Sequence, residues 1–216
     1  MRNSKVKTLV LYALFIALTL LLGLSSLGYI YLPFASVTIV HIPVIIAAYL
    51  FGIKGGALIG FFFGLTSLIQ CFMAPDMIAM IVLGTETGFG IYNLLLILVV
   101  LFLPRILTGV FAALVYKALA RKKADSLIAM GASAVIGSLT NTVLLLGALY
   151  IFAYDQSAAG FGLTGAFTAG DFLKVLLGIV SFNGLLEAAA AMIISTALGK
   201  VLIKFVMKPE IKRVGE

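Results

Sequence analysis

Residues 94–116 read LLLILVVLFLPRILTGVFAALVY, two apolar segments separated by Pro104 and the cation Arg105. A run this long and apolar predicts a membrane-spanning helix, since about 20 such residues cross the hydrocarbon core of a bilayer. Pro104 removes a backbone donor and disfavours helical geometry at Leu103, so we expect the helix to kink or to begin there. A guanidinium in hydrocarbon is costly and normally has a partner or lines a cavity. Arg105 is therefore the first candidate for a functional residue.

The remainder of the chain predicts the same environment. Of its 216 residues, 63% are hydrophobic and only 11% are charged, which is typical of a polytopic membrane protein rather than a soluble domain. We expect an all-α membrane protein that forms a single integral membrane domain over residues 1–216. Its six predicted spans are Thr8–Leu27, Val37–Phe51, Gly56–Met73, Ile91–Arg121, Ser126–Phe152 and Asp171–Val206.

Charge alternates along the breaks between these spans. Breaks rich in Lys and Arg alternate with breaks that are uncharged or mainly acidic, such as those around Asp76 and Asp171. By the positive-inside rule this predicts six transmembrane helices with both termini in the cytoplasm. The net charge of +7 then reflects topology rather than a nucleic-acid partner. The basic breaks contain Arg2, Lys5 and Lys7; Lys54; Lys117 and Arg121 to Lys123; and Lys200 to Arg213.

Several polar side chains share the expected depth of Arg105. At about 1.5 Å per residue, Arg105 lies about 24 Å above the cytoplasmic Arg121, in the outer half of the membrane. An arginine with carboxamides and hydroxyls suits a small monoanion that also carries amide or hydroxyl groups. The candidate ligand-binding residues are Arg105, Asn141, Asn183, Thr140, Glu187 and His41, with Tyr92 at the outer boundary.

Each of these residues has a structural alternative. Asn141 and Asn183 also fit interhelical hydrogen bonds, which are common in membrane bundles. Glu187 could neutralise Arg105 in an ion pair instead of facing a ligand. His41, two residues before Pro43, fits packing or helix capping. Tyr92 fits the belt of aromatic residues at the membrane boundary.

Enzyme chemistry has little support in the composition. The chain has one His and one Cys, with no HExxH zinc motif, no Walker A motif and no pair of intramembrane acids. We therefore expect no enzyme activity and no cofactor in this chain. If transport is energised, another chain must supply the energy.

Small residues spaced four apart mark two helix faces. They are Ala13 and Ala17 in the first span and Gly56, Gly60 and Gly64 in the third. Such stripes let a second helix approach closely. They predict docking of a partner protein or, for the glycines, packing within the bundle.

Three stretches carry a family resemblance. They are LPFASVTIVHIPVIIAAYLFGIKGGALIGFFFGLTSLI (Leu32 to Ile69), LPRILTGVFAALVYKAL (Leu103 to Leu119) and the Ala13-x-x-x-Ala17 pattern. Together they resemble the substrate-binding S component of energy-coupling factor (ECF) vitamin transporters, most closely the pantothenate-specific member. The resemblance implies a vitamin pocket near the outer face of a bacterial cytoplasmic membrane. It also implies docking, through Ala13 and Ala17, on a transmembrane coupling subunit with two cytoplasmic ATPase subunits.

Two other functions stay open. An S component for pyridoxine or hydroxymethylpyrimidine would rely on stacking by Tyr92 or Phe89 and would need Arg105 less. A stand-alone facilitator would need a continuous polar path, whereas the inner part of the sixth span, such as Ala188 to Ser195, is mostly apolar. Pantothenate, with a carboxylate, an amide and two hydroxyls, fits the donor-rich set best.

Overall fold

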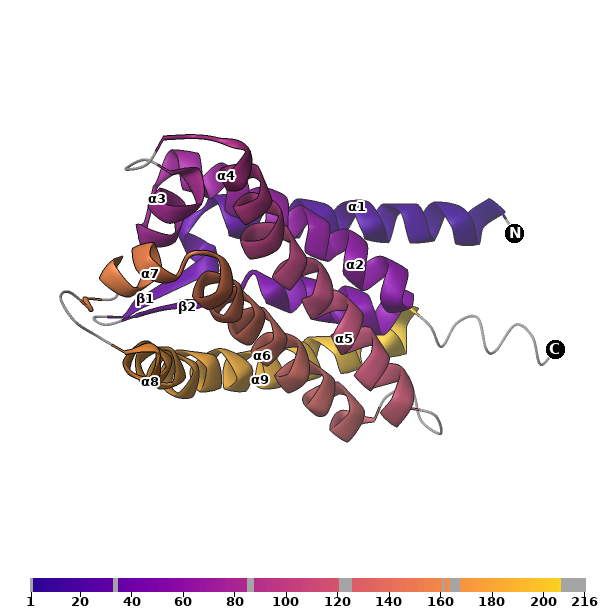
Figure 1. Cartoon of the computed structure of the whole chain (residues 1–216). Coiled ribbons are helices and arrows are strands. Elements are labelled where there is room, and N and C mark those ends of the chain that lie inside the picture. The colour runs from indigo at the N-terminus through magenta and orange to yellow at the C-terminus, as the bar shows by residue number, and fades with distance from the viewer. Residues whose placement is uncertain are drawn as a thin grey trace.

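Long helices that lie side by side form most of the molecule (Figure 1). The computed structural model describes residues 2–32, 35–84, 88–120, 126–160, 162–163 and 168–206. Five helical segments within these residues are long and apolar enough to cross a membrane. This confirms the expected helical membrane bundle. The segments contain α1 (Arg2–Leu24), α2 (His41–Met73), α5 (Leu103–Leu119), α6 (Leu127–Phe152) and α9 (Leu185–Val206).

Helix α2 reverses direction at Gly52. The backbone there has φ 68° and ψ −157°, a conformation that glycine tolerates and other residues rarely adopt. Phe51 stacks on Tyr12 in the middle of α1, with ring centroids 4.2 Å apart. Thr66, after the reversal, lies against Gly23 near the end of α1. The two arms of α2 cover the expected second and third segments, Val37–Phe51 and Gly56–Met73, except that the first arm begins at His41 rather than at Val37.

Two of the long segments contain a π-helical turn. In the first, α4 (Ile91–Leu96) and the turn η2 (Ile97–Phe102) lead into α5. In the second, α8 (Ala169–Ile179) and the turn η3 (Val180–Gly184) lead into α9. The α-helix α5 begins at Leu103, beside Pro104 as expected, although Leu103 itself keeps helical angles of −57° and −49°. The Leu103 amide bonds to the carbonyl of Leu98, five residues back, and this wider turn accommodates the proline ring.

Short elements gather at one end of the bundle. A 3₁₀ turn (Ser26–Gly28) leads into an antiparallel hairpin of β1 (Tyr29–Leu32) and β2 (Ala35–Thr38), in which Tyr29 pairs with Thr38. Helices α3 (Met77–Leu83) and α7 (Tyr154–Gly160) lie at the same end, opposite the start of α1 and the end of α9 (Figure 1). We call this the hairpin end. No sequence signal indicated these short elements, and Val37 and Thr38 of β2 were expected to begin the second span.

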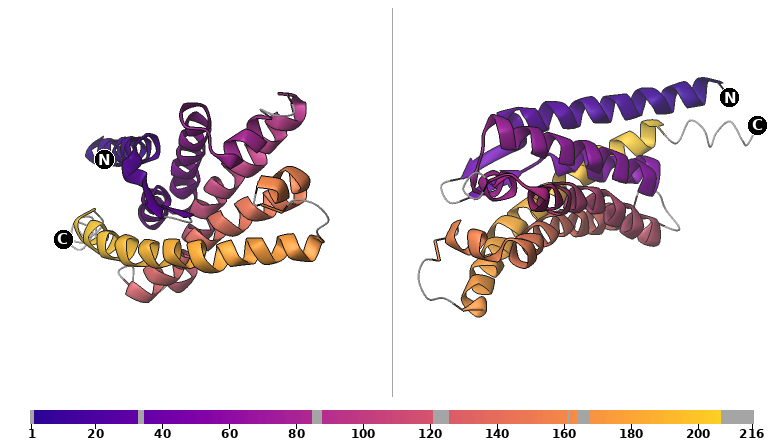
Figure 2. Two further views of the ribbon diagram at one scale, coloured as in Figure 1. Left: turned by 90° about the vertical axis from the view of Figure 1, so that its left-hand side faces the viewer. Right: turned by 45° about the horizontal axis from the view of Figure 1, so that its top comes forward.

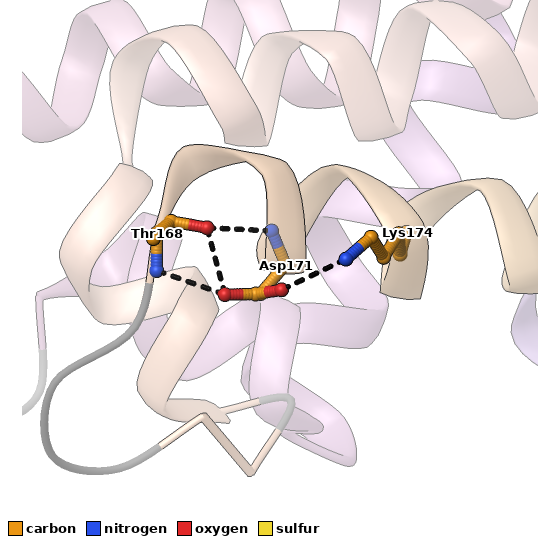
Figure 3. Close-up of polar contacts among 3 residues, drawn as sticks. All are labelled: Thr168, Asp171 and Lys174. Atoms are coloured by element: carbon orange, nitrogen blue, oxygen red, sulfur yellow. Dashed lines mark hydrogen bonds and ion pairs between the residues drawn. The ribbon is translucent and has the colours of Figure 1, made fainter.

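Local hydrogen bonds fix the start of α8 at the hairpin end. Thr168 and Asp171 cap each other, and Lys174 donates to Asp171 Oδ1 at 3.1 Å (Figure 3). The Thr168 hydroxyl and backbone amide both bond to the Asp171 carboxylate, which satisfies donors that have no partner within the helix. The expected start of the sixth span at Asp171 is therefore within three residues of the observed helix start.

The second arm of α2 packs closely on α5. A Cβ at Gly56 would lie 2.5 Å from the Gly109 carbonyl oxygen, and one at Gly60 only 2.3 Å from the Arg105 carbonyl oxygen. Small residues permit this approach, and the resulting contact fixes α5 against α2. Helix α1, in contrast, lies at the edge of the bundle (Figure 2). Arg105 is therefore carried by the most tightly held helix pair.

Candidate functional site

Helices α2, α5 and α6 are in contact one helical turn away from the level at which the polar candidate residues were expected. A Cβ at Gly137 of α6 would lie 3.3 Å from Ile45 of α2 and 3.4 Å from the Thr108 carbonyl oxygen of α5. One turn nearer the hairpin end, these helices carry Asn141, His41 and the Pro104-Arg105 pair. The expected common depth of these residues thus follows from how the helices pack.

Arg105 is only 8% exposed and is held on two sides. Its Nη1 donates to the Val100 carbonyl at 2.7 Å, and its guanidinium carbon lies 5.4 Å from the centroid of the Phe63 ring. In a regular helix the amide of residue 104 would donate to the Val100 carbonyl, but proline has no amide hydrogen. Pro104 therefore leaves an acceptor for the arginine beside it, and the Phe63 ring adds a cation–π contact.

Glu187, on α9, is 6% exposed and joins three segments. Its Oε1 accepts from the Thr38 backbone amide at 2.8 Å, and its Oε2 accepts from the Thr142 hydroxyl at 3.1 Å. Arg105 is near enough to act on the carboxylate electrostatically. A buried carboxylate is stable only when donors replace its water, and the hairpin and α6 supply them here.

Other polar groups at this level have unused hydrogen-bonding capacity. No described residue donates to the buried Asn141 Oδ1, which belongs to a side chain only 7% exposed. The His41 ring is completely buried beside the Thr38 backbone and makes no hydrogen bond of ordinary geometry to a described residue. Buried polar groups without partners are destabilising, by about 1–3 kcal/mol each. Their gathering beside a buried cation is typical of a binding site.

Asn183 lies beside this group and is half-buried. It belongs to the π turn η3 and directly precedes Gly184, where a Cβ would lie 3.6 Å from Thr142 Cγ2. Arg105 likewise follows the π turn η2 closely. Such turns are frequent at functional sites because they change the direction of nearby side chains. Pro104 was a sequence signal for the first turn, whereas the second had none.

Two predicted ligand-binding residues lie apart from this group. The Thr140 hydroxyl donates to the Ile136 carbonyl of its own helix at 2.7 Å. Tyr92 is 51% exposed, and its hydroxyl donates to the Phe152 carbonyl at the hairpin end of α6. Both hydroxyls therefore bond to backbone carbonyls, and we leave these residues out of the site.

The two small-residue stripes have different surroundings. Ala13 and Ala17 are exposed on α1, beside Leu14 and Leu18, which are 58% and 39% exposed. The glycines that begin at Gly56 are buried against α5 and η2, so they pack within the molecule. Of the two interpretations of the glycines, packing within the bundle therefore describes this structure, and docking of a partner does not. Gly60 and Gly64 contact Arg105, Ile106, Leu101 and Phe102.

Four contributors to the site were not predicted from the sequence. Thr142 was not distinguished from its neighbour Thr140, and Phe63 lies in a run of three identical residues. The Val100 carbonyl and the Thr38 amide are backbone groups, so residue type gives no sign of them. Among the described residues, no cluster of three His, Cys, Asp or Glu side chains could hold a metal ion.

Comparison with known proteins identifies the family. The family model described as "ECF transporter, substrate-specific component" matches residues 7–199. The chain is 31% identical to the pantothenic acid transporter PanT of Lactococcus lactis subsp. cremoris (strain MG1363), over 94% of this chain and 97% of that protein. It is 30% identical to the pantothenate transporter PanT of Leuconostoc mesenteroides subsp. mesenteroides, over 98% of this chain and all of that protein. These relatives are transporters, not enzymes. The chain belongs to the substrate-specific components of ECF transporters.

Proposed function

We propose that this chain is the pantothenate-binding subunit of an ATP-driven vitamin importer in a bacterial cytoplasmic membrane. Two relatives that align over nearly the whole chain are named for pantothenate transport. The observation that carries the proposal is a buried guanidinium, Arg105, in one layer with Asn141 Oδ1, to which no described residue donates. A fork of donors binds a carboxylate, while carboxamides satisfy amide and hydroxyl groups in either direction.

The proposed roles follow from these surroundings. Arg105 binds the carboxylate, because its guanidinium is held in place by Val100 and Phe63. Asn141 and Asn183 orient the amide and hydroxyl groups, and His41 offers a further polar contact from α2. Binding would supply partners to the buried Asn141 and His41 atoms that have none among the described residues.

The proposed topology has six crossings with both termini in the cytoplasm. The two arms of α2 run in opposite directions and count as two crossings, one of them short. Described lysines at the end opposite the hairpin support a cytoplasmic location for that end. They are Lys5, Lys7, Lys54, Lys117, Lys200 and Lys204. The other charged residues used to predict the topology, Arg121 to Lys123, Glu86 and the cations after Val206, lie outside the described residues.

The proposed partners are a transmembrane coupling subunit and two cytoplasmic ATPase subunits. Helix α1 is the proposed docking element, since it lies at the edge of the bundle and exposes Ala13 and Ala17 (Figure 2). Two exposed alanines four residues apart let another helix approach closely. ATP hydrolysis would take place in the partners.

Calorimetric titration of the purified protein with pantothenate tests the ligand and the role of Arg105. Arg105→Ala should weaken binding by about 2 kcal/mol or more, roughly thirtyfold, because a desolvated charge pair is lost. Lys117→Ala, which removes an exposed cation from the same helix, should bind like the parent. Equal affinity of a folded Arg105→Ala protein would reject the proposed role. Tight binding of pyridoxine or hydroxymethylpyrimidine in place of pantothenate would reject the ligand.

A further inference from the structure

The carboxylate of Glu187 lies at a junction of the hairpin with two helices. It belongs to α9, accepts from the Thr142 hydroxyl of α6, and accepts from the Thr38 amide at the end of β2. Both bonds connect residues far apart in sequence, by 149 positions for Thr38 and 45 for Thr142. The side chain is thus in a position to tie the hairpin to the helices.

The backbone of the hairpin needs an acceptor such as the Glu187 carboxylate. Thr38 is the terminal residue of β2 and pairs with Tyr29 across the two-stranded sheet. A two-stranded hairpin is marginal by itself, and its outward backbone groups need partners. The next residue, Ile39, donates to the Gly28 carbonyl at 2.9 Å. Of these two successive amides, that of Thr38 therefore bonds to α9 and that of Ile39 bonds to the 3₁₀ turn.

The bonding of Glu187 indicates a role other than ligand contact. Its two oxygens each already accept one hydrogen bond, from groups that the protein itself supplies. A ligand would have to compete with these donors. The hairpin also ends only three residues before His41, the first residue of α2, so its placement helps to set the position of that buried ring.

We propose that Glu187 is a positioning residue that fixes the β1–β2 hairpin and the start of α2 beside the ligand layer. This inference rests on the proposed function for its effect on ligand binding, but its structural part needs no ligand. Loss of the Glu187 carboxylate should release the Thr38 amide and loosen the hairpin. Bound pantothenate should then leave faster, whereas its association rate should change little.

Amide hydrogen exchange at Thr38, measured by NMR on the ligand-free protein in lipid nanodiscs, tests the structural part. In Glu187→Ala the exchange should be about tenfold faster or more, as expected when a hydrogen bond to a charged acceptor is lost. Thr142→Val removes the second donor and should speed exchange less. Thr140→Val is the matched control on the same helix, since its hydroxyl bonds to Ile136, and it should leave Thr38 exchange unchanged.

Glu187→Gln provides a second variant if the alanine protein does not fold. Its side-chain carbonyl oxygen is a neutral acceptor and bonds the Thr38 amide less strongly than a carboxylate does, so exchange between that of the parent and that of the alanine variant is expected. Unchanged Thr38 exchange in a folded Glu187→Ala or Glu187→Gln protein would overturn the inference. So would exchange that responds equally to Thr140→Val.

Pantothenate dissociation rates, measured by displacement of radiolabelled pantothenate, test the functional part separately. Faster exchange at Thr38 with a dissociation rate raised about tenfold supports the inference in full. Faster exchange with an unchanged dissociation rate would overturn the link between hairpin and ligand. Absence of pantothenate binding in the parent protein would overturn the proposed function, and the exchange result would still decide the role of Glu187.

Discussion

Replacing Pro104 by alanine should weaken ligand binding and, unusually for a membrane-helix variant, raise stability. The new amide at position 104 would compete with Arg105 Nη1 for the Val100 carbonyl, which the arginine now holds at 2.7 Å. Proline is about 3 kcal/mol less favourable than alanine inside a helix, so the melting temperature should rise or stay level. Opposite signs for stability and binding distinguish this mechanism from simple damage to the fold.

The size of the binding effect follows from preorganisation. Arg105 would keep its charge and its place near Phe63 but lose its hydrogen bond to the Val100 carbonyl. Ordering a long side chain again on binding costs about 0.5–1.5 kcal/mol, so pantothenate affinity should fall about two- to tenfold. This is smaller than the effect of Arg105→Ala, in which the charge itself is removed.

Calorimetry for affinity and thermal melting for stability should be run in the same detergent. Pro75→Ala makes the same chemical change in the exposed turn between α2 and α3 and should leave affinity as it is. A Pro104→Ala protein that melts higher and binds pantothenate as tightly as the parent would refute the proposed positioning of Arg105 by Val100. A protein that melts much lower would refute the account of the π turn.

Three further predictions concern packing, docking and Asn141. Gly60→Ala should lower stability by about 1–3 kcal/mol in thermal melting, because its Cβ would lie 2.3 Å from the Arg105 carbonyl oxygen; Gly147→Ala, with nothing within 4 Å, should not. Ala17→Trp should abolish co-purification with the coupling subunit but spare pantothenate binding, whereas Ala197→Trp, at an exposed alanine of α9, should spare both. Asn141→Leu should stabilise the ligand-free protein by about 1 kcal/mol and weaken pantothenate binding in calorimetry, and lower stability with full binding would contradict this.

The long helices could be predicted from sequence because hydrocarbon leaves the backbone few alternatives. A chain in a bilayer must satisfy its own hydrogen bonds, so apolar length alone located the long segments to within a few residues. The short elements at the hairpin end lie where water or headgroups are available, and this constraint is absent there. Their residues therefore appeared as loops. The reversal at Gly52 was anticipated as a break between two spans, with Lys54 beside it.

The depth of the site residues could also be predicted, whereas their orientation could not. Depth follows from counting residues at about 1.5 Å each from a helix end. Orientation in a soluble helix follows from the contrast between polar and apolar faces, but α6 is apolar almost all round and offers little contrast. Thr140 and Thr142 show the result, since they lie at nearly one depth but about 200° apart around the helix. Only Thr142 reaches Glu187.

Backbone partners explain why the role of Glu187 could not be chosen from sequence. The sequence suggested two roles for Glu187, an ion pair with Arg105 and a contact with the ligand. Both roles assume that a buried carboxylate is bound by a side chain or by a ligand. One of its two donors in the structure is instead a backbone amide of a hairpin that the sequence did not reveal. Every non-proline residue carries such a donor, so a pattern of residue types cannot mark the one that is used. A carboxylate whose role is to accept hydrogen bonds from a backbone amide and a hydroxyl should then tolerate glutamine better than alanine, which is the order expected for Thr38 exchange.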